Sequence, residues 1–156
     1  MDGSKTTHYI GDNMDETTNQ STNQSTNQSA NQAITPKKIL CIEDEFFISE
    51  LYERALKKAG HRVITALNGQ DGLELAQTNN YDLVLLDLMV PGITGMEILR
   101  ILKDPAKSPN FNSKIVITTN LDQTDAIREE LEKQADGYII KAGITPKELT
   151  SFVNQL

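Results

Sequence analysis

Residues 83–92 read Leu-Val-Leu-Leu-Asp-Leu-Met-Val-Pro-Gly, and this stretch decides the fold class. Four aliphatic residues run into Asp87, and a Pro-Gly pair follows at 91–92. A short apolar run bounded by turn residues is typical of a strand that is buried on both faces, as in a parallel sheet. Open α/β sheets bind their ligands at the carboxyl ends of such strands, so Asp87 is predicted to lie in a functional site.

Apolar segments with strand-like and helix-like periods alternate along the chain after Pro36. Runs rich in branched aliphatic residues predict strands over 38–42, 62–66, 81–86, 114–118 and 138–140. Apolar residues spaced three and four apart predict helices over 46–59, 69–78, 95–103, 124–134 and 146–155. Strand-then-helix units with short connections predict an α/β fold with a doubly wound five-stranded parallel sheet and helices on both faces.

The first 35 residues differ sharply in composition from the rest. Residues 17–32 hold four variants of the polar tetrapeptide Ser-Thr-Asn-Gln, and between 11 and 33 only Met14, Ala30 and Ala33 are apolar. A segment with so few apolar side chains cannot offset the entropy that ordering would cost. We therefore predict that residues 1–35 form a disordered polar low-complexity tail and that residues 36–156 form the folded domain.

The bulk composition excludes several classes of partner. The 156 residues include 15 Lys and Arg against 22 Asp and Glu, which gives a formal net charge of −7. An acidic domain without a basic cluster is a poor nucleic-acid binder, so no direct nucleic-acid partner is expected. No apolar run approaches the ~18 residues of a membrane span, and a single cysteine, Cys41, cannot form an internal disulfide. We expect a cytoplasmic protein with no membrane association.

Two further acids follow the first predicted strand. Glu43 and Asp44 should therefore meet Asp87 at the same edge of the sheet. Three carboxylates in one pocket repel one another, and a hard divalent cation with oxygen ligands, such as Mg²⁺, relieves that repulsion. Glu43 and Asp44 could instead only stabilise the positively charged N-terminal end of the next helix dipole. That alternative does not explain the acid at position 87. The pattern predicts a Mg²⁺ site.

Two threonines and a lysine stand at the ends of the fourth and fifth predicted strands, 114–118 and 138–140. Lys141 follows the last predicted strand, where it could pair with Asp87 and with a transferred phosphoryl group. The fourth strand ends in Thr118, Thr119 and Asn120. A hydroxyl there could donate to an oxyanion, although threonine is common at strand ends without such a role.

Together these motifs resemble the receiver domains of two-component response regulators and are similar to single-domain chemotaxis regulators. The resemblance covers about residues 37–156 and implies a flavodoxin-like fold with strand order 2-1-3-4-5. It implies that Asp87 is the phosphoacceptor, with Mg²⁺ bound directly by Asp44, largely through water by Glu43, and by the backbone carbonyl of Met89.

The resemblance also implies roles for residues on the last two strands. Lys141 would pair with the phosphoryl group, Thr119 would be the switch hydroxyl, and Tyr138 would be the aromatic residue that changes rotamer. We choose Thr119 because counting back from Lys141 matches the family's spacing, which leaves Thr118 as the last residue within the strand.

The function implied is phosphorelay signal transduction. A histidine kinase or histidine phosphotransfer protein would phosphorylate Asp87 in a Mg²⁺-dependent reaction, forming an aspartyl phosphate. The face of the fourth helix, fifth strand and fifth helix would then switch. The protein would catalyse only its own phosphorylation and dephosphorylation and so would not be an enzyme. Since the sequence ends at Leu156, we expect a stand-alone receiver, a monomer or weak homodimer that docks to a downstream protein target.

Departures from the family pattern keep alternatives open. Ala142 stands where proline, in a cis peptide, is usual, Asn120 replaces a small residue, and the loop 104–113 is long. If these changes disabled switching, the chain would be a phosphate-independent protein-interaction module on the same fold. A hydrolase of the aspartyl-phosphate type is disfavoured because Met89 stands where a second acid is needed. A flavin carrier is disfavoured because Glu43 and its neighbours form no phosphate cradle.

Overall fold

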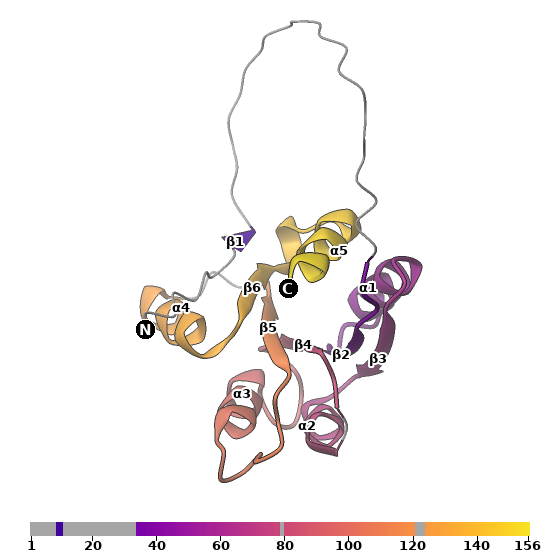
Figure 1. Ribbon diagram of the computed structural model, residues 1–156. Coiled ribbons are helices and arrows are strands. Elements are labelled where there is room, and N and C mark those ends of the chain that lie inside the picture. Colours follow the sequence, from indigo (N-terminus) through magenta and orange to yellow (C-terminus); the bar gives the residue numbers. More distant parts are fainter. Residues whose placement is uncertain (1–8, 11–33, 79, 121–123) are drawn as a thin grey trace, which may run out of the picture.

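The computed structural model describes residues 9–10, 34–78, 80–120 and 124–156 (Figure 1). In these ranges the strands form one parallel sheet of order β1-β6-β5-β4-β2-β3. Strands β2 to β6 confirm the predicted doubly wound sheet with order 2-1-3-4-5. Their bounds are β2 (Lys38–Ile42), β3 (Arg62–Ala66), β4 (Leu83–Asp87), β5 (Lys114–Thr119) and β6 (Gly137–Ile140).

Helices cover both faces of the sheet, as predicted. One hydrophobic cluster joins the sheet to α1 and α5, and the other joins it to α2, α3 and α4 (Figure 1). Helix α3 begins at a capping box in which the hydroxyl oxygen of Thr94 accepts from the backbone N–H of Glu97. The helices are α1 (Phe46–Lys58), α2 (Gly69–Thr78), α3 (Gly95–Lys103), α4 (Asp125–Gln134) and α5 (Pro146–Gln155).

Strand β4 is buried at all five positions, which explains the apolar run 83–86 before Asp87. Helix α3 packs so closely against its end that the first helical residue must be glycine. A Cβ atom on Gly95 would lie 2.2 Å from the carbonyl oxygen of Asp87. The start of α3 and the end of β4 are therefore held together by main-chain contact.

Several predicted boundaries are wrong by one or two residues, as is usual at the ends of elements. Strand β4 begins at Leu83 and includes Asp87, whereas 81–86 was predicted. Strand β5 extends through Thr119, so Thr118 is not its last residue. Helix α1 ends at Lys58. These shifts leave every element in its predicted place.

A sixth strand was not predicted. The two residues of β1 (Tyr9–Ile10) pair in parallel with β6, Tyr9 opposite Tyr138 and Ile10 opposite Ile139. These two residues fall within the predicted tail, and their main chain adds to the edge of the sheet at β6. The division into a tail over 1–35 and a domain over 36–156 stays a prediction. The tetrapeptide repeats lie outside the described residues. Within the described ranges, no helix is long and apolar enough to cross a bilayer.

Candidate functional site

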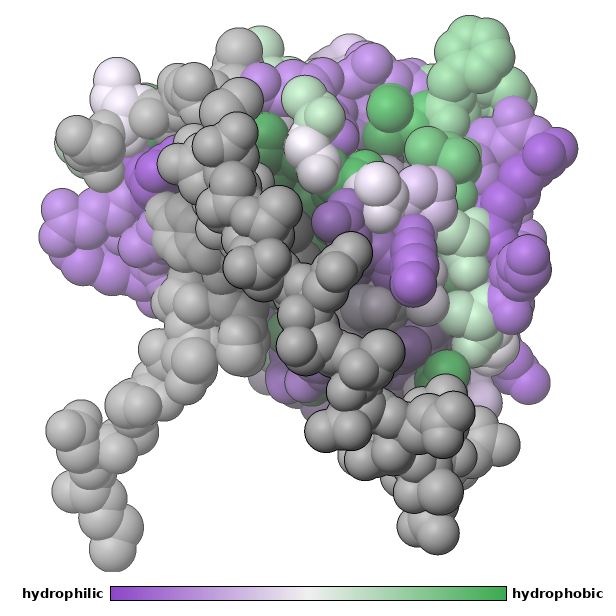
Figure 2. Space-filling view, turned by 90° about the horizontal axis from the view of Figure 1, so that it is seen from above, coloured by the Kyte–Doolittle hydropathy of each residue, from purple (hydrophilic) through white to green (hydrophobic). Residues whose placement is uncertain are grey.

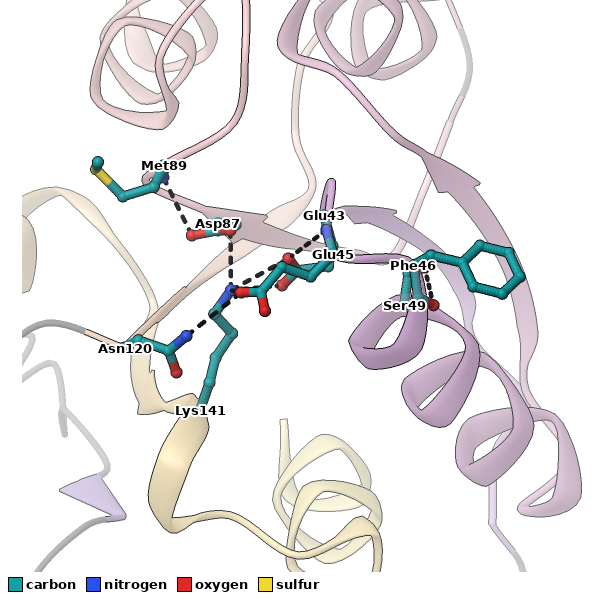
Figure 3. Close-up of polar contacts among 8 residues, drawn as sticks. All are labelled: Glu43, Glu45, Phe46, Ser49, Asp87, Met89, Asn120 and Lys141. Atoms are coloured by element: carbon teal, nitrogen blue, oxygen red, sulfur yellow. Dashed lines mark hydrogen bonds and ion pairs between the residues drawn. The ribbon is translucent and has the colours of Figure 1, made fainter.

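Charged side chains gather where the carboxyl ends of β2, β4 and β6 reach one edge of the sheet (Figure 3). Glu43 follows the last residue of β2, Asp87 is the last residue of β4, and Lys141 follows the last residue of β6. The neighbouring strands pair in parallel register up to these ends, so the three side chains start from the same level. The structure thus brings together the acids and the lysine that the sequence placed at strand ends.

The three predicted acids form one cluster. Carboxylate oxygens of Glu43, Asp44 and Asp87 lie within 4.8 Å of one another; Glu43 and Asp87 are buried, whereas Asp44 is exposed. Opposite ligands of Mg²⁺ lie about 4.2 Å apart because each bond is about 2.1 Å long. Oxygens within 4.8 Å of one another are thus close enough for one such ion, and three carboxylates are a donor set that this cation favours. The residues fit the predicted metal.

Lys141 is the central cation of the site. Its Nζ donates to Oδ2 of Asp87 at 2.9 Å, to Oε2 of Glu43 at 2.9 Å and to Oε1 of Glu45 at 3.0 Å (Figure 3). The Lys141 side chain is only 2% exposed. Because the lysine is surrounded by acids, its charge offsets part of the repulsion among them in the metal-free protein.

The burial of these charges changes their pKa values. Burial raises the pKa of Glu43 to about 7, and the nearby charge of Asp87 adds to this rise, while the hydrogen bond from Lys141 opposes it. Burial alone would lower the pKa of Lys141, but its hydrogen bonds to Asp87, Glu43 and Glu45 outweigh burial and raise it. Lys141 is therefore charged at neutral pH, and Glu43 titrates near neutrality.

Two backbone contacts orient the acids. The backbone N–H of Met89 donates to Oδ1 of Asp87 at 3.1 Å, and the backbone N–H of Glu45 donates to Oε1 of Glu43 at 3.1 Å. Each carboxylate is thus held by the loop that follows its own strand. Oδ2 of Asp87 and both carboxylate oxygens of Glu43 accept from Lys141.

The two predicted switch residues share one face of the sheet. Thr119 is fully buried at the end of β5, and Tyr138 on β6 is 2% exposed. Tyr138 lies opposite Ile117, two residues before Thr119 on the same strand. Side chains two apart on a strand point to the same face, so Thr119 and Tyr138 are diagonal neighbours. This arrangement is the one that a coupled movement of the two side chains requires.

Glu45 is a residue that sequence reasoning missed. Its carboxylate accepts from Lys141 and also from the side-chain amide of Asn120 at 3.3 Å. The available signal was its place as the third acid in the run 43–45, directly after Glu43 and Asp44. Glu45 does stand at the N-cap of α1, but its side chain makes no capping hydrogen bond.

The loop after Lys141 has Ala142 where the family pattern has proline. The described residues contain no cis peptide bond, so the Lys141–Ala142 link is trans. A short 3₁₀ turn, η1 (Lys141–Gly143), connects β6 to the segment before α5. The lysine therefore reaches the acids from a turn in which no residue needs the cis form.

Large hydrophobic side chains are exposed beside the acids. Phe46 is 61% exposed, Phe47 83% and Met89 65%. In the space-filling view, hydrophobic side chains lie toward the right, the side on which Figure 1 places α1 (Figure 2). The charged cluster thus opens beside a surface that a protein partner could contact.

The fold and the site define a class, the flavodoxin-like α/β proteins with an acidic cluster, typical of a Mg²⁺ site, at the carboxyl ends of the strands. Residues 39–154 match the model of the response regulator receiver domain, and the chain belongs to that family. Membership places it among two-component signalling proteins, and the family is not a class of conventional enzymes, as we expected.

Three relatives illustrate the match. The transcriptional regulatory protein AfsQ1 of Streptomyces coelicolor is 39% identical over 103 residues, which cover 66% of this chain and 44% of AfsQ1. The receiver domain of Francisella response regulator 1452 is 30% identical, with a TM-score of 0.66 over 76% of this chain and 94% of that one. TrrA of Thermotoga maritima, solved in complex with Mg²⁺-BeF, is 33% identical, with a TM-score of 0.63 over 76% and 97%.

The chain spans less than half the length of the curated relatives it matches, 44% for AfsQ1. Our expectation that it acts as a stand-alone receiver therefore stays a prediction.

Proposed function

We propose that Asp87 accepts a phosphoryl group from a histidine kinase or histidine phosphotransfer protein and that residues 36–156 form the unit that does so. The observation that carries this proposal is the cluster of Glu43, Asp44 and Asp87, with carboxylate oxygens within 4.8 Å, beside the Lys141 ammonium at 2.9 Å from Asp87. Acids that converge without a cation would be costly. Acids that converge on a cation can hold a metal and a phosphoryl group together.

The chain's own residues supply position and charge for the transfer. An oxygen of Asp87 forms a bond to phosphorus while the bond from phosphorus to the donor imidazole nitrogen breaks, and that nitrogen keeps the electron pair. Glu43, Asp44, Asp87 and the backbone carbonyl of Met89 would hold Mg²⁺. When bound, Mg²⁺ neutralises charge on the phosphoryl oxygens during transfer. The ammonium group of Lys141 also neutralises charge on the phosphoryl oxygens.

The switch would start from the modified Asp87. Its phosphoryl group recruits the hydroxyl of Thr119, which leaves space that Tyr138 enters. Burial of Thr119 and Tyr138 as diagonal neighbours on one face of the sheet supports this coupling, because space left by one side chain in a packed core is open to the other. The face of α4, β6 and α5 then presents a different surface to a downstream protein target.

The exposed surface beside the site supports a protein partner. Phe46 and Phe47 are exposed at the start of α1, directly after Glu45 in the chain, and would contact the phosphodonor protein. We place the protein in the cytoplasm, as a monomer or weak homodimer, with no direct contact to nucleic acid or membrane. The net charge of −7 is consistent with the absence of direct contact to nucleic acid or membrane.

Labelling by radioactive acetyl phosphate with Mg²⁺ tests the assignment. The wild type should be labelled, Asp87→Asn should not, and EDTA should abolish labelling. Asp71→Asn, which removes an exposed acid from the first turn of α2, is the control and should label normally. Undiminished labelling of Asp87→Asn would refute the assignment. A wild type that neither labels nor binds beryllium fluoride at millimolar Mg²⁺ would favour the phosphate-independent interaction module.

A further inference from the structure

The carboxylate of Glu45 reaches across the site from the start of α1 (Figure 3). Its Oε1 accepts from the Lys141 ammonium at 3.0 Å and from the Asn120 side-chain amide at 3.3 Å. These two donors come from the loops after β6 and β5, on the side of Asp87 away from Met89. One anionic oxygen is thus held by a cation and an amide beside the proposed phosphoacceptor.

Lys141 has no donor to spare in this arrangement. An ammonium group has three N–H donors, and Lys141 has three carboxylate partners, Glu43, Glu45 and Asp87. A phosphoryl group on Asp87 that is to pair with Lys141 must therefore take the place of one of them.

Of the two glutamates that contact Lys141, Glu45 leaves at the lower cost. Its side chain is 51% exposed, whereas the side chain of Glu43 is 1% exposed. A half-exposed carboxylate regains water when it swings away, but a buried one would be left without a partner. Glu45 also gives up no helix cap by moving, because its side chain makes no capping hydrogen bond.

We propose that Glu45 is an intramolecular competitor of the phosphoryl group. Its carboxylate takes the place on Lys141 and Asn120 that tetrahedral, anionic phosphoryl oxygens occupy once Asp87 is modified. The inference rests on the proposed function of Asp87 and adds a residue that sets how readily the site accepts the group. Glu45 thereby favours the unmodified state and must leave before the modified state is complete.

The affinity for beryllium fluoride in the presence of Mg²⁺ tests the competition without any turnover. ¹⁹F NMR can follow the titration of the full chain. Glu45→Gln keeps the shape of the side chain and removes its charge, and it should raise the affinity about three- to tenfold, the range for a half-exposed charge close to an anion. Glu50→Gln is the matched control, because it removes the same charge one turn further along α1, where Glu50 pairs with Arg54 at 2.9 Å. Its affinity should match the wild type.

A second measurement reports the contact itself. The ¹⁵N-bound side-chain amide signals of Asn120 should move in ligand-free Glu45→Gln but stay in place in Glu50→Gln. A complex in the wild type with no gain for Glu45→Gln over Glu50→Gln, or with a loss of affinity, would overturn the competition and leave the proposed function intact. Absence of any beryllium fluoride complex in the wild type would instead overturn the proposed function, and the competition with it.

Discussion

Replacing Lys141 by methionine removes a cation that contacts both buried acids, Glu43 and Asp87. Methionine keeps an unbranched side chain of similar length, so the packing of the stem is largely retained. The change leaves Glu43 and Asp87, which lie 2.9 Å from Nζ and are 1% and 2% exposed, without their counter-charge. The variant therefore isolates the electrostatic role of the lysine in the metal-free protein.

The expected loss of stability follows from the cost of an unpaired buried charge. Breaking a buried ion pair by removing one partner costs about 3–5 kcal/mol. For a domain of this size, 1 kcal/mol corresponds to roughly 4 °C in Tm, so at pH 8 in EDTA we expect a drop of about 12–20 °C. Protonation of one acid reduces the repulsion, so the loss should be smaller at pH 5.5. Millimolar Mg²⁺ should also restore stability, because a second cation replaces the first.

Thermal and urea unfolding, followed by circular dichroism at both pH values with and without Mg²⁺, measure these effects. Lys133→Met is the control. Lys133 pairs with Glu129 at 2.9 Å, but both side chains are exposed, so its loss should cost about 0–1 kcal/mol at either pH. An equal loss for Lys141→Met under all four conditions would refute the reasoning, since it would mean that the lysine contributes packing and not charge.

Three more predictions concern the same edge of the sheet. Glu43 has a folded pKa of about 7 against an ordinary value of 4.5. Its contribution to the stability of the metal-free protein is therefore fully present below about pH 4.5 and is lost as the pH rises through 7. Glu43→Gln should flatten the dependence of the unfolding free energy on pH by about 1–3 kcal/mol after allowance for screening, and identical pH profiles for variant and wild type would contradict this. Gly95→Ala puts a Cβ 2.2 Å from the carbonyl oxygen of Asp87, so it should lower the free energy of unfolding by about 1–3 kcal/mol and slow labelling. Gly143→Ala, whose Cβ would have nothing within 4 Å, is the control and should lower it by under about 0.5 kcal/mol. Equal losses would show that the contact between residue 95 and Asp87 relaxes freely. Met89→Asn should shorten the lifetime of the aspartyl phosphate in a filter-binding decay assay, because an amide beside Asp87 can orient the attacking water and the apolar Met89 cannot; the same decay rate as the wild type would refute this.

The fold could be predicted because its determinants are local and repeated. The apolar run before Asp87 is buried at every position, and each predicted helix lies within a residue of its predicted bounds. Convergence at the site also followed from topology, since parallel strands place their carboxyl ends at one edge. No long-range information was needed beyond the order of the strands.

Two features could not be predicted, for different physical reasons. The strand Tyr9–Ile10 is too short for any periodicity to show, and its partner is 129 positions further along the chain. The role of Glu45 depends on a side-chain direction set by Lys141, 96 residues away. Neither the periodicity of apolar residues in a short stretch of sequence nor helix propensity contains this information. The loop residues that complete the site are therefore found only in three dimensions.

Strand β1 has a practical consequence for any shortened form of this protein. β6 contains Gly, Tyr, Ile and Ile and no charged residue, while β3, at the opposite edge of the sheet, begins with the exposed Arg62. Charged residues discourage edge-to-edge pairing, and β6 has none. A protein cut to begin at residue 36 would present the bare main chain of β6 to its neighbours. Self-association of such a fragment would then be a consequence of the missing strand β1. The oligomeric state of the protein therefore has to be measured on a chain that includes residues 9 and 10.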